Sequence, residues 1–72
     1  MERIVRLKAA SGVEYPFCDF QCVCSFDYGR PLYIIQGCYY HDDQNHWMSI
    51  ECYFEVDDAK NKLFYLKSLL DA

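Results

Sequence analysis

Residues 47–70, WMSIECYFEVDDAKNKLFYLKSLL, contain a change of hydrophobic period that decides the fold class. In the first part, 47–56, apolar side chains recur at every second position, which predicts a half-buried β-strand. After Asp57–Asp58, apolar residues instead follow one helical face: Ala59, Leu63, Leu66 and Leu70. This spacing predicts a C-terminal helix over 58–70, and an aspartate favours its start by capping the first turn and complementing the helix dipole.

Three more strands are predicted upstream, over 3–9, 17–26 and 32–40, from alternation or from β-branched and aromatic content. Pro16 cannot donate to a ladder, so the chain just before 17–26 is expected to be an edge or irregular segment. Short polar turns between successive strands favour an antiparallel meander. The sequence therefore predicts a single α+β domain over 1–72. We expect a small antiparallel sheet of about four strands with one C-terminal helix packed on one face.

The stretch CDFQCVCSF, residues 18–26, holds three of the five cysteines. The strand period predicts one face with five members: Cys18, Phe20, Cys22, Cys24 and Phe26. The opposite face is mostly polar, as in a half-buried strand, and free cysteine is among the residues most often buried. We therefore expect these cysteines to pack in the core, in the layer beneath the helix.

Other interpretations of the cysteines stay open. A zinc site would need a second ligand pair besides Cys18 and Cys22, and the candidates lack the paired spacing of zinc knuckles: Cys38, Cys52, His41 and His46. A disulfide framework is disfavoured because five cysteines cannot all pair within one chain. A thioredoxin-like redox centre lacks its C-x-x-C motif. The prediction is a protein without cofactor or metal.

Length and composition indicate a small folded protein. At 72 residues it lies near the lower size limit for folding alone, and its 18% aromatic content is unlike that of disordered chains. No apolar run approaches the roughly 18 residues of a membrane span, and the first residues lack the apolar core of a secretory signal. We therefore expect a cytoplasmic protein with mostly reduced thiols.

The net charge of −4 bears on the partner. Nucleic-acid binding depends on Lys and Arg that neutralise phosphates, and only seven such residues are present. Direct nucleic-acid binding is therefore disfavoured. An acidic chain suits a partner with a basic surface, which includes proteins that themselves bind nucleic acid.

No catalytic constellation stands out. His41 and His46 both belong to a predicted polar loop over 41–46, where His, Asp and Asn are ordinary residues. Glu51 and Glu55 are four positions apart on a strand, about 13 Å by strand rise, which is too far to share a proton. The sequence has no phosphate-binding glycine loop, no G-x-S-x-G and no H-E-x-x-H. We therefore predict a non-enzymatic protein.

One helix covers only one face of a sheet. We expect the covered face of strand 47–56 to carry its even-numbered residues: Met48, Ile50, Cys52, Phe54 and Val56. The opposite face would then carry Trp47, Glu51, Tyr53 and Glu55. Strand 32–40 is apolar on both sides, so the sequence leaves open which set joins that face: Tyr33, Ile35 and Tyr39, or Leu32, Ile34 and Tyr40.

The second sheet face is expected to be covered by another molecule, either as a homodimer or with a different protein. Aromatic residues are enriched in interface cores, and acidic residues steer association with a basic partner. The predicted partner-binding residues are Tyr39, Tyr40, Asp42, Asp43, Trp47, Glu51, Tyr53 and Glu55. The alternative that the tyrosines only pad the sheet through cross-strand contacts stays open.

Specific residues identify no family. In size, charge and lack of catalytic motifs, the chain resembles the compact acidic proteins with which phages and mobile elements block host machinery, including anti-CRISPR and anti-restriction inhibitors. That resemblance implies a binding protein that docks on and blocks a basic, nucleic-acid-handling protein. The alternatives are a small metal- or thiol-dependent protein that uses Cys18, Cys22 and Cys24, and a structural subunit of a larger complex.

Overall fold

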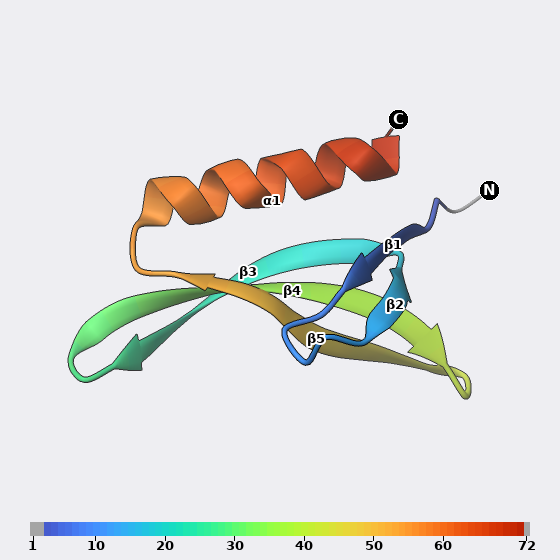
Figure 1. Ribbon diagram of the computed structural model, residues 1–72, viewed down its shortest axis with the longest axis horizontal. Coiled ribbons are helices and arrows are strands. Elements are labelled where there is room, and N and C mark those ends of the chain that lie inside the picture. The colour runs from blue at the N-terminus through green and yellow to red at the C-terminus, as the bar shows by residue number, and fades with distance from the viewer. Residues whose placement is uncertain (1–2, 72) are drawn as a thin grey trace.

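The computed structural model describes residues 3–71, which form five strands followed by a C-terminal helix (Figure 1). The elements are β1 (Val5–Lys8), β2 (Glu14–Phe17), β3 (Asp19–Asp27), β4 (Arg30–His41), β5 (Gln44–Tyr53) and α1 (Val56–Asp71). β1 and β2 form one antiparallel sheet, and β3, β4 and β5 form a second antiparallel sheet in that order. The predicted α+β class is confirmed. The predicted domain of 1–72 also includes residues 1, 2 and 72, which lie outside the described residues.

The prediction of one sheet with about four strands is wrong, because the segment before residue 18 forms a strand of its own. The predicted strand 17–26 is divided by a bend at Cys18, and Phe17 belongs to β2. β2 pairs only with β1, where Pro16 lies opposite Arg6. A two-stranded sheet accommodates this proline, since each strand has an outer edge that makes no ladder bonds.

Tight turns join the strands of the larger sheet. The polar loop predicted over 41–46 is instead a two-residue turn, so β5 begins at Gln44 and continues the ladder. Asp42 and Asp43 adopt positive φ angles of 53° and 63°, and Tyr28 and Gly29 do the same between β3 and β4 at 51° and 78°. Positive φ at both central residues matches the right-handed twist of a hairpin. Both hairpins are therefore longer than the sequence predicted.

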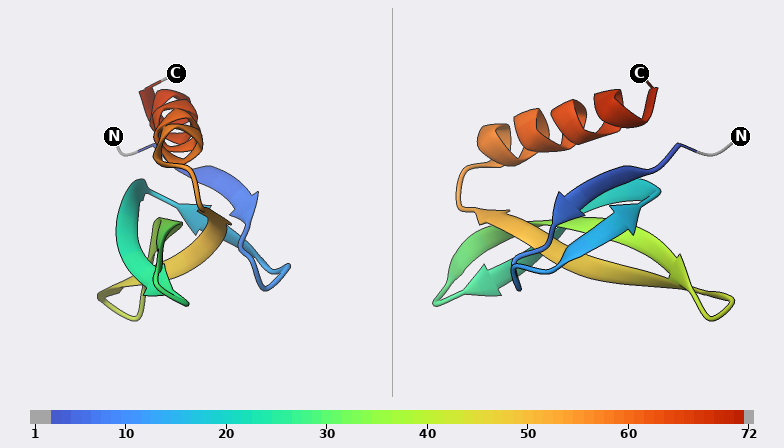
Figure 2. Two further views of the ribbon diagram at one scale, coloured as in Figure 1. Left: turned by 90° about the vertical axis from the view of Figure 1, so that its left-hand side faces the viewer. Right: turned by 45° about the vertical axis from the view of Figure 1, so that its right-hand side comes forward.

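The helix and the β1–β2 hairpin lie on the same side of the three-stranded sheet (Figures 1 and 2). The most deeply buried side chains come from all three parts: Phe17, Phe20, Ile35 and Leu66. The Phe17 ring lies directly over Gly37 of β4, where a Cβ atom would approach ring carbons to 2.5 Å. Only glycine permits this close packing of the hairpin on the sheet.

A β-bulge in β5 changes which residues face the core. Ile35 pairs with Glu51 and Gln36 pairs with Ser49, so Ile50 has no partner of its own in the ladder. Beyond the bulge the alternation is reset, and Tyr53 shares the face of its partner Tyr33, which packs against the core. The prediction that residues 48 to 56 present their even-numbered side chains to the helix is therefore wrong after Ile50.

The predicted cysteine-bearing face of 18–26 is also only partly buried. Phe20 and Cys22 pack in or against the core, as expected. Cys18 lies outside the strands, Cys24 is exposed, and Phe26 is 74% exposed. In Figure 1 the β3–β4 hairpin extends past the first turn of α1, so the end of β3 receives no cover from the helix.

The helix begins at Val56, two positions before the prediction, and Asp57 and Asp58 lie in its first turn. Its inner face packs on the core, and two ion pairs hold its flanks: Lys62 Nζ lies 3.6 Å from Glu51 Oε1, and Lys67 Nζ lies 3.8 Å from Asp19 Oδ1. Across residues 3–71, no helix has the length and apolar character needed to cross a membrane.

Candidate functional site

The side of the three-stranded sheet that faces away from α1 and the β1–β2 hairpin is uncovered in the described part of the chain (Figure 2). We call it the open face. Register and alternation assign to it Gln21, Val23, Ser25, Leu32, Ile34, Gln36, Trp47, Ser49 and Cys52. Ile35 is fully buried on the other side. The choice that the sequence left open is thus resolved in favour of Leu32 and Ile34.

The middle of the open face carries no charge. Val23, Ile34 and Cys52 lie side by side across the three strands, and Gln21 Nε2 donates to Gln36 Oε1 at 2.7 Å in the next row. Val23, Leu32 and Ile34 are half-buried only by their neighbours in the sheet. The result is a neutral, largely apolar strip.

The free end of the β4–β5 hairpin adds aromatic and acidic groups to the same face. Tyr40 is 61% exposed and Trp47 is 40% exposed. The Tyr40 hydroxyl donates to Asp43 Oδ1 at 3.2 Å, within the turn that also carries Asp42. We call Tyr40, Asp42, Asp43 and Trp47 the hairpin-tip site.

The structure separates the other predicted partner-binding residues from this site. Tyr39 lies on the covered side, where its ring stacks between Tyr15 at 4.7 Å and His46 at 5.2 Å between centroids. Tyr53 also packs against the core, and its hydroxyl donates to Glu51 Oε2.

Glu51, Tyr53 and Glu55 gather instead near the start of α1. The bulge places Glu51 within reach of Lys62 of the helix, and Glu55 lies in the link that precedes α1. The hydrogen bond to Glu51, with smaller contributions from burial and from Asp58, raises the pKa of Tyr53 to about 12. The eight residues predicted as one surface thus fall into two separate groups, four at the hairpin tip and three near the start of α1, with Tyr39 packed on the covered side.

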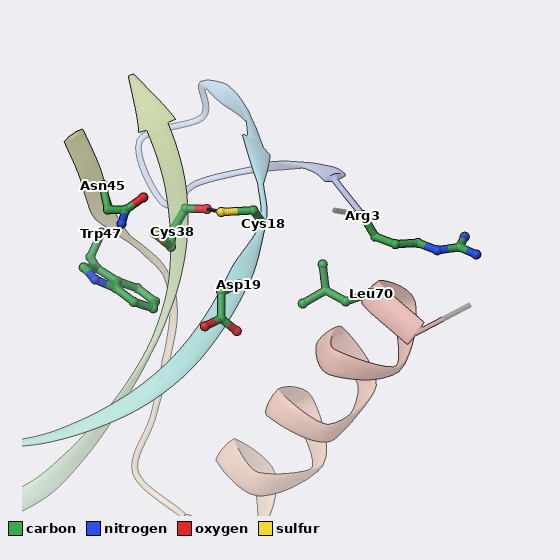
Figure 3. Close-up of a pocket in the computed structure, with 7 residues that line it drawn as sticks. All are labelled: Arg3, Cys18, Asp19, Cys38, Asn45, Trp47 and Leu70. Carbon is green, nitrogen blue, oxygen red and sulfur yellow. Dashed lines mark hydrogen bonds between the residues drawn. The ribbon is translucent and has the colours of Figure 1, made fainter. Parts of the chain in front are cut away.

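A cavity of about 520 Å³ opens beside the hairpin-tip site (Figure 3). Its lining is Arg3, Cys18, Asp19, Cys38, Asn45, Trp47 and Leu70. In Figure 3, Asn45 and Trp47 of β5 lie on one side, Arg3 and Leu70 on the other, and Asp19 between them. Of these residues, only Trp47 belongs to the predicted partner-binding set, while Cys18 and Cys38 were considered only as cysteines of a metal or thiol site.

The cysteines and histidines do not form a metal centre among residues 3–71: no three potential ligands there are placed to share an ion. All five cysteines are free. Burial raises the pKa of the Cys38 thiol, and the neighbouring Cys18 thiol raises it further. His41 Nε2 lies 3.3 Å from Asp42 Oδ2, and His46 Nε2 lies 3.3 Å from the His41 carbonyl oxygen, so both rings are engaged at the turn.

No protein-family model matches the chain, and no curated protein or solved structure is significantly similar to it.

Proposed function

We propose that this is a non-enzymatic binding protein that attaches to a basic surface of a protein partner through the hairpin-tip site. The observation that carries the proposal is the gathering of Tyr40, Trp47 and an acidic turn at one end of an uncovered, uncharged sheet face. Exposed aromatic side chains of this kind dominate the cores of interfaces.

The geometry suits recognition with little loss of conformational freedom. The two-residue turn and the β4–β5 ladder next to it fix the backbone beneath the site before a partner arrives. Trp47 and Tyr40 would supply buried contact, while Asp42 and Asp43 would attract a positively charged surface and speed association. A protein that handles nucleic acid is the partner class we favour, since such proteins carry basic surfaces, and a docked module would block them as an inhibitor.

The neutral middle of the open face is the natural place for self-association. Two copies that each carry a charge of −4 repel one another least where neither presents a charge, and the strip around Val23, Leu32 and Ile34 meets that condition. We therefore propose a homodimer through this strip. A cytoplasmic site of action agrees with the five free cysteines.

The test is affinity capture from an extract of the source cells, with the tagged protein and two variants as baits. One variant is Trp47→Ala. The other is the double change Asp42→Asn and Asp43→Asn, which removes both charges and keeps residues that tolerate positive φ. We expect a basic protein that the unchanged bait captures and both variants lose, with at least a tenfold weaker Kd for the purified pair.

Phe64→Ala is the matched control, because Phe64 is an exposed aromatic residue on α1, outside the hairpin-tip site. It should retain full binding. Nucleic acid should compete with the unchanged protein for the captured partner. The proposal would be contradicted if both site variants still captured the partner. It would also be contradicted if Phe64→Ala abolished the capture.

A further inference from the structure

Cys18 and Cys38 lie beside each other at the edge of the cavity, although twenty residues separate them in sequence. The backbone N–H of Cys18 donates to the Cys38 carbonyl oxygen at 2.8 Å, and Cys18 Sγ contacts the same oxygen at 3.4 Å (Figure 3). The thiols also influence each other directly, since a hydrogen bond with Cys18 contributes to the raised pKa of Cys38. The pair is therefore a dithiol rather than two isolated cysteines.

The backbone brings the two residues together. Cys38 is the ladder partner of Asp19, and its carbonyl oxygen also accepts the N–H of Cys18, the residue just before β3. Paired backbones run about 4.7–4.9 Å apart, and disulfides span Cα distances of about 4.4–6.8 Å. The pair is therefore placed where a disulfide can form.

The two thiols differ in access. Cys38 is 5% exposed, whereas Cys18 is half-buried at the bend between β2 and β3. Both residues line the cavity. This places Cys18 to react first with a molecule from solution and Cys38 to react second from within the protein.

We propose that Cys18 and Cys38 form a reversible disulfide on exposure to a small-molecule disulfide such as oxidised glutathione. The Cys18 thiolate attacks one glutathione sulfur, breaks the glutathione disulfide and releases one glutathione thiolate, which takes up a proton. Cys38 then loses its proton and attacks the Cys18 sulfur, which releases the second glutathione. Overall, two protein thiols are oxidised and one disulfide is reduced to two glutathione thiols.

Trp47 is positioned to report this reaction. It is the ladder partner of Cys38, it lines the same cavity, and it is the single tryptophan of the chain. A disulfide next to an indole ring quenches its emission by accepting an electron from the excited state. The inference does not depend on the proposed function, because its readouts are thiol chemistry and fluorescence rather than partner binding.

The experiment treats the reduced protein with oxidised glutathione and measures intact mass, tryptophan emission and disulfide connectivity. Cleavage after aromatic residues separates the three clustered cysteines, since Cys18 then lies in the fragment 18–20 and Cys22 and Cys24 in 21–26. We expect a disulfide link between 18–20 and 34–39 that carries no glutathione, together with quenched emission, while the exposed Cys24 and Cys52 can each take up glutathione. Reduction with dithiothreitol should reverse the link and the quenching.

Cys18→Ser is the decisive variant, because its side chain is half-buried and the change leaves the core intact. We expect it to abolish the internal disulfide and the quenching. Cys24→Ser is the matched control on the neighbouring strand segment and should react like the unchanged protein. The proposal is overturned if Cys18 of the unchanged protein stops at a mixed disulfide with glutathione, if Cys18 or Cys38 links to another cysteine, or if neither reacts. An internal link to Cys38 in Cys18→Ser would overturn it as well.

Discussion

The two faces of the three-stranded sheet carry similar apolar residues but differ in how deeply these residues are buried. On the covered face, Phe20 and Ile35 are fully buried because α1 and the β1–β2 hairpin both lie on them. On the open face, Val23 and Ile34 belong to the same two strands but are only half-buried. Side-chain type therefore does not distinguish the two faces of β4, whereas the layer packed above each residue does.

Both layers that pack on the three-stranded sheet, α1 and the β1–β2 hairpin, lie on one of its faces. A domain of 72 residues has little material for a third layer, so a strand that is apolar on both sides keeps one side available for contact. The hairpin-tip site adds Tyr40 and Trp47 to that available side. Stability should therefore depend on one face and association on the other.

The largest expected effect compares two adjacent isoleucines. Ile35→Ala should lower the free energy of unfolding by about 3–4 kcal/mol, because it empties a fully buried site. Ile34→Ala should cost about 1 kcal/mol, since its side chain is already partly in water. Urea denaturation of both variants measures the difference.

Protein concentration is the control for this pair. If the open face is a dimer contact, the Ile34→Ala loss should grow with concentration while the Ile35→Ala loss should not. Equal losses at low concentration would mean that another part of the chain covers Ile34, and the distinction between the faces would fail.

Gly37 tests how closely the β1–β2 hairpin packs on the covered face. Gly37→Ala should destabilise the protein by about 1–3 kcal/mol, because its Cβ would meet Phe17 ring carbons at 2.5–2.7 Å. In the Phe17→Leu background, the smaller side chain leaves room, so the added cost of Gly37→Ala should shrink. A double-mutant cycle by denaturation measures this coupling, and additive losses would place Phe17 away from Gly37.

A smaller effect on stability is expected at the β4–β5 turn, at the end of the open face, because a change there acts mainly through the backbone. Asp43 has a positive φ of 63°, where a residue with a Cβ is disfavoured. Asp43→Gly should therefore raise the free energy of unfolding by up to about 1 kcal/mol, while Asp43→Ala should not raise it. Thermal denaturation distinguishes the two variants. A lower stability of Asp43→Gly would show that the hydrogen bond from Tyr40 to Asp43 contributes more than the relief of backbone strain in the turn.

Much of this fold is predictable from periodicity, and the failures have specific causes. The helix and the strands around Ile35 and Met48 follow clear patterns, so their type was predicted correctly. The bulge at Ile50 leaves no trace in the sequence, because an inserted residue looks like any other member of an apolar strand. It alone moved Glu51 and Tyr53 from the open face to the helix side.

The candidate site was half predictable for a related reason. Tyr40, Asp42, Asp43 and Trp47 are close in sequence, so a tight hairpin with this register brings them together. Cys18 approaches Cys38 because the bend after β2 brings the Cys18 N–H to the Cys38 carbonyl oxygen. Long-range juxtapositions of this kind depend on tertiary register, which local pattern does not encode.

The smallest expected effect tests the consequence of the bulge at Ile50. The pKa of Tyr53 is raised to about 12 from 10, chiefly by the hydrogen bond to Glu51, so folding favours its protonated form. The stability it contributes is complete below about pH 10 and is lost as the pH rises through 12. A titration of tyrosinate absorbance should show one late tyrosine that Tyr53→Phe removes and Glu51→Gln shifts down. Asp58→Asn on the helix should also lower that pKa slightly, because Asp58 contributes to it. If Asp58→Asn leaves the pKa of Tyr53 unchanged, the Tyr53 side chain faces away from α1. The assignment of the residues after Ile50 to the two faces of the sheet would then be wrong.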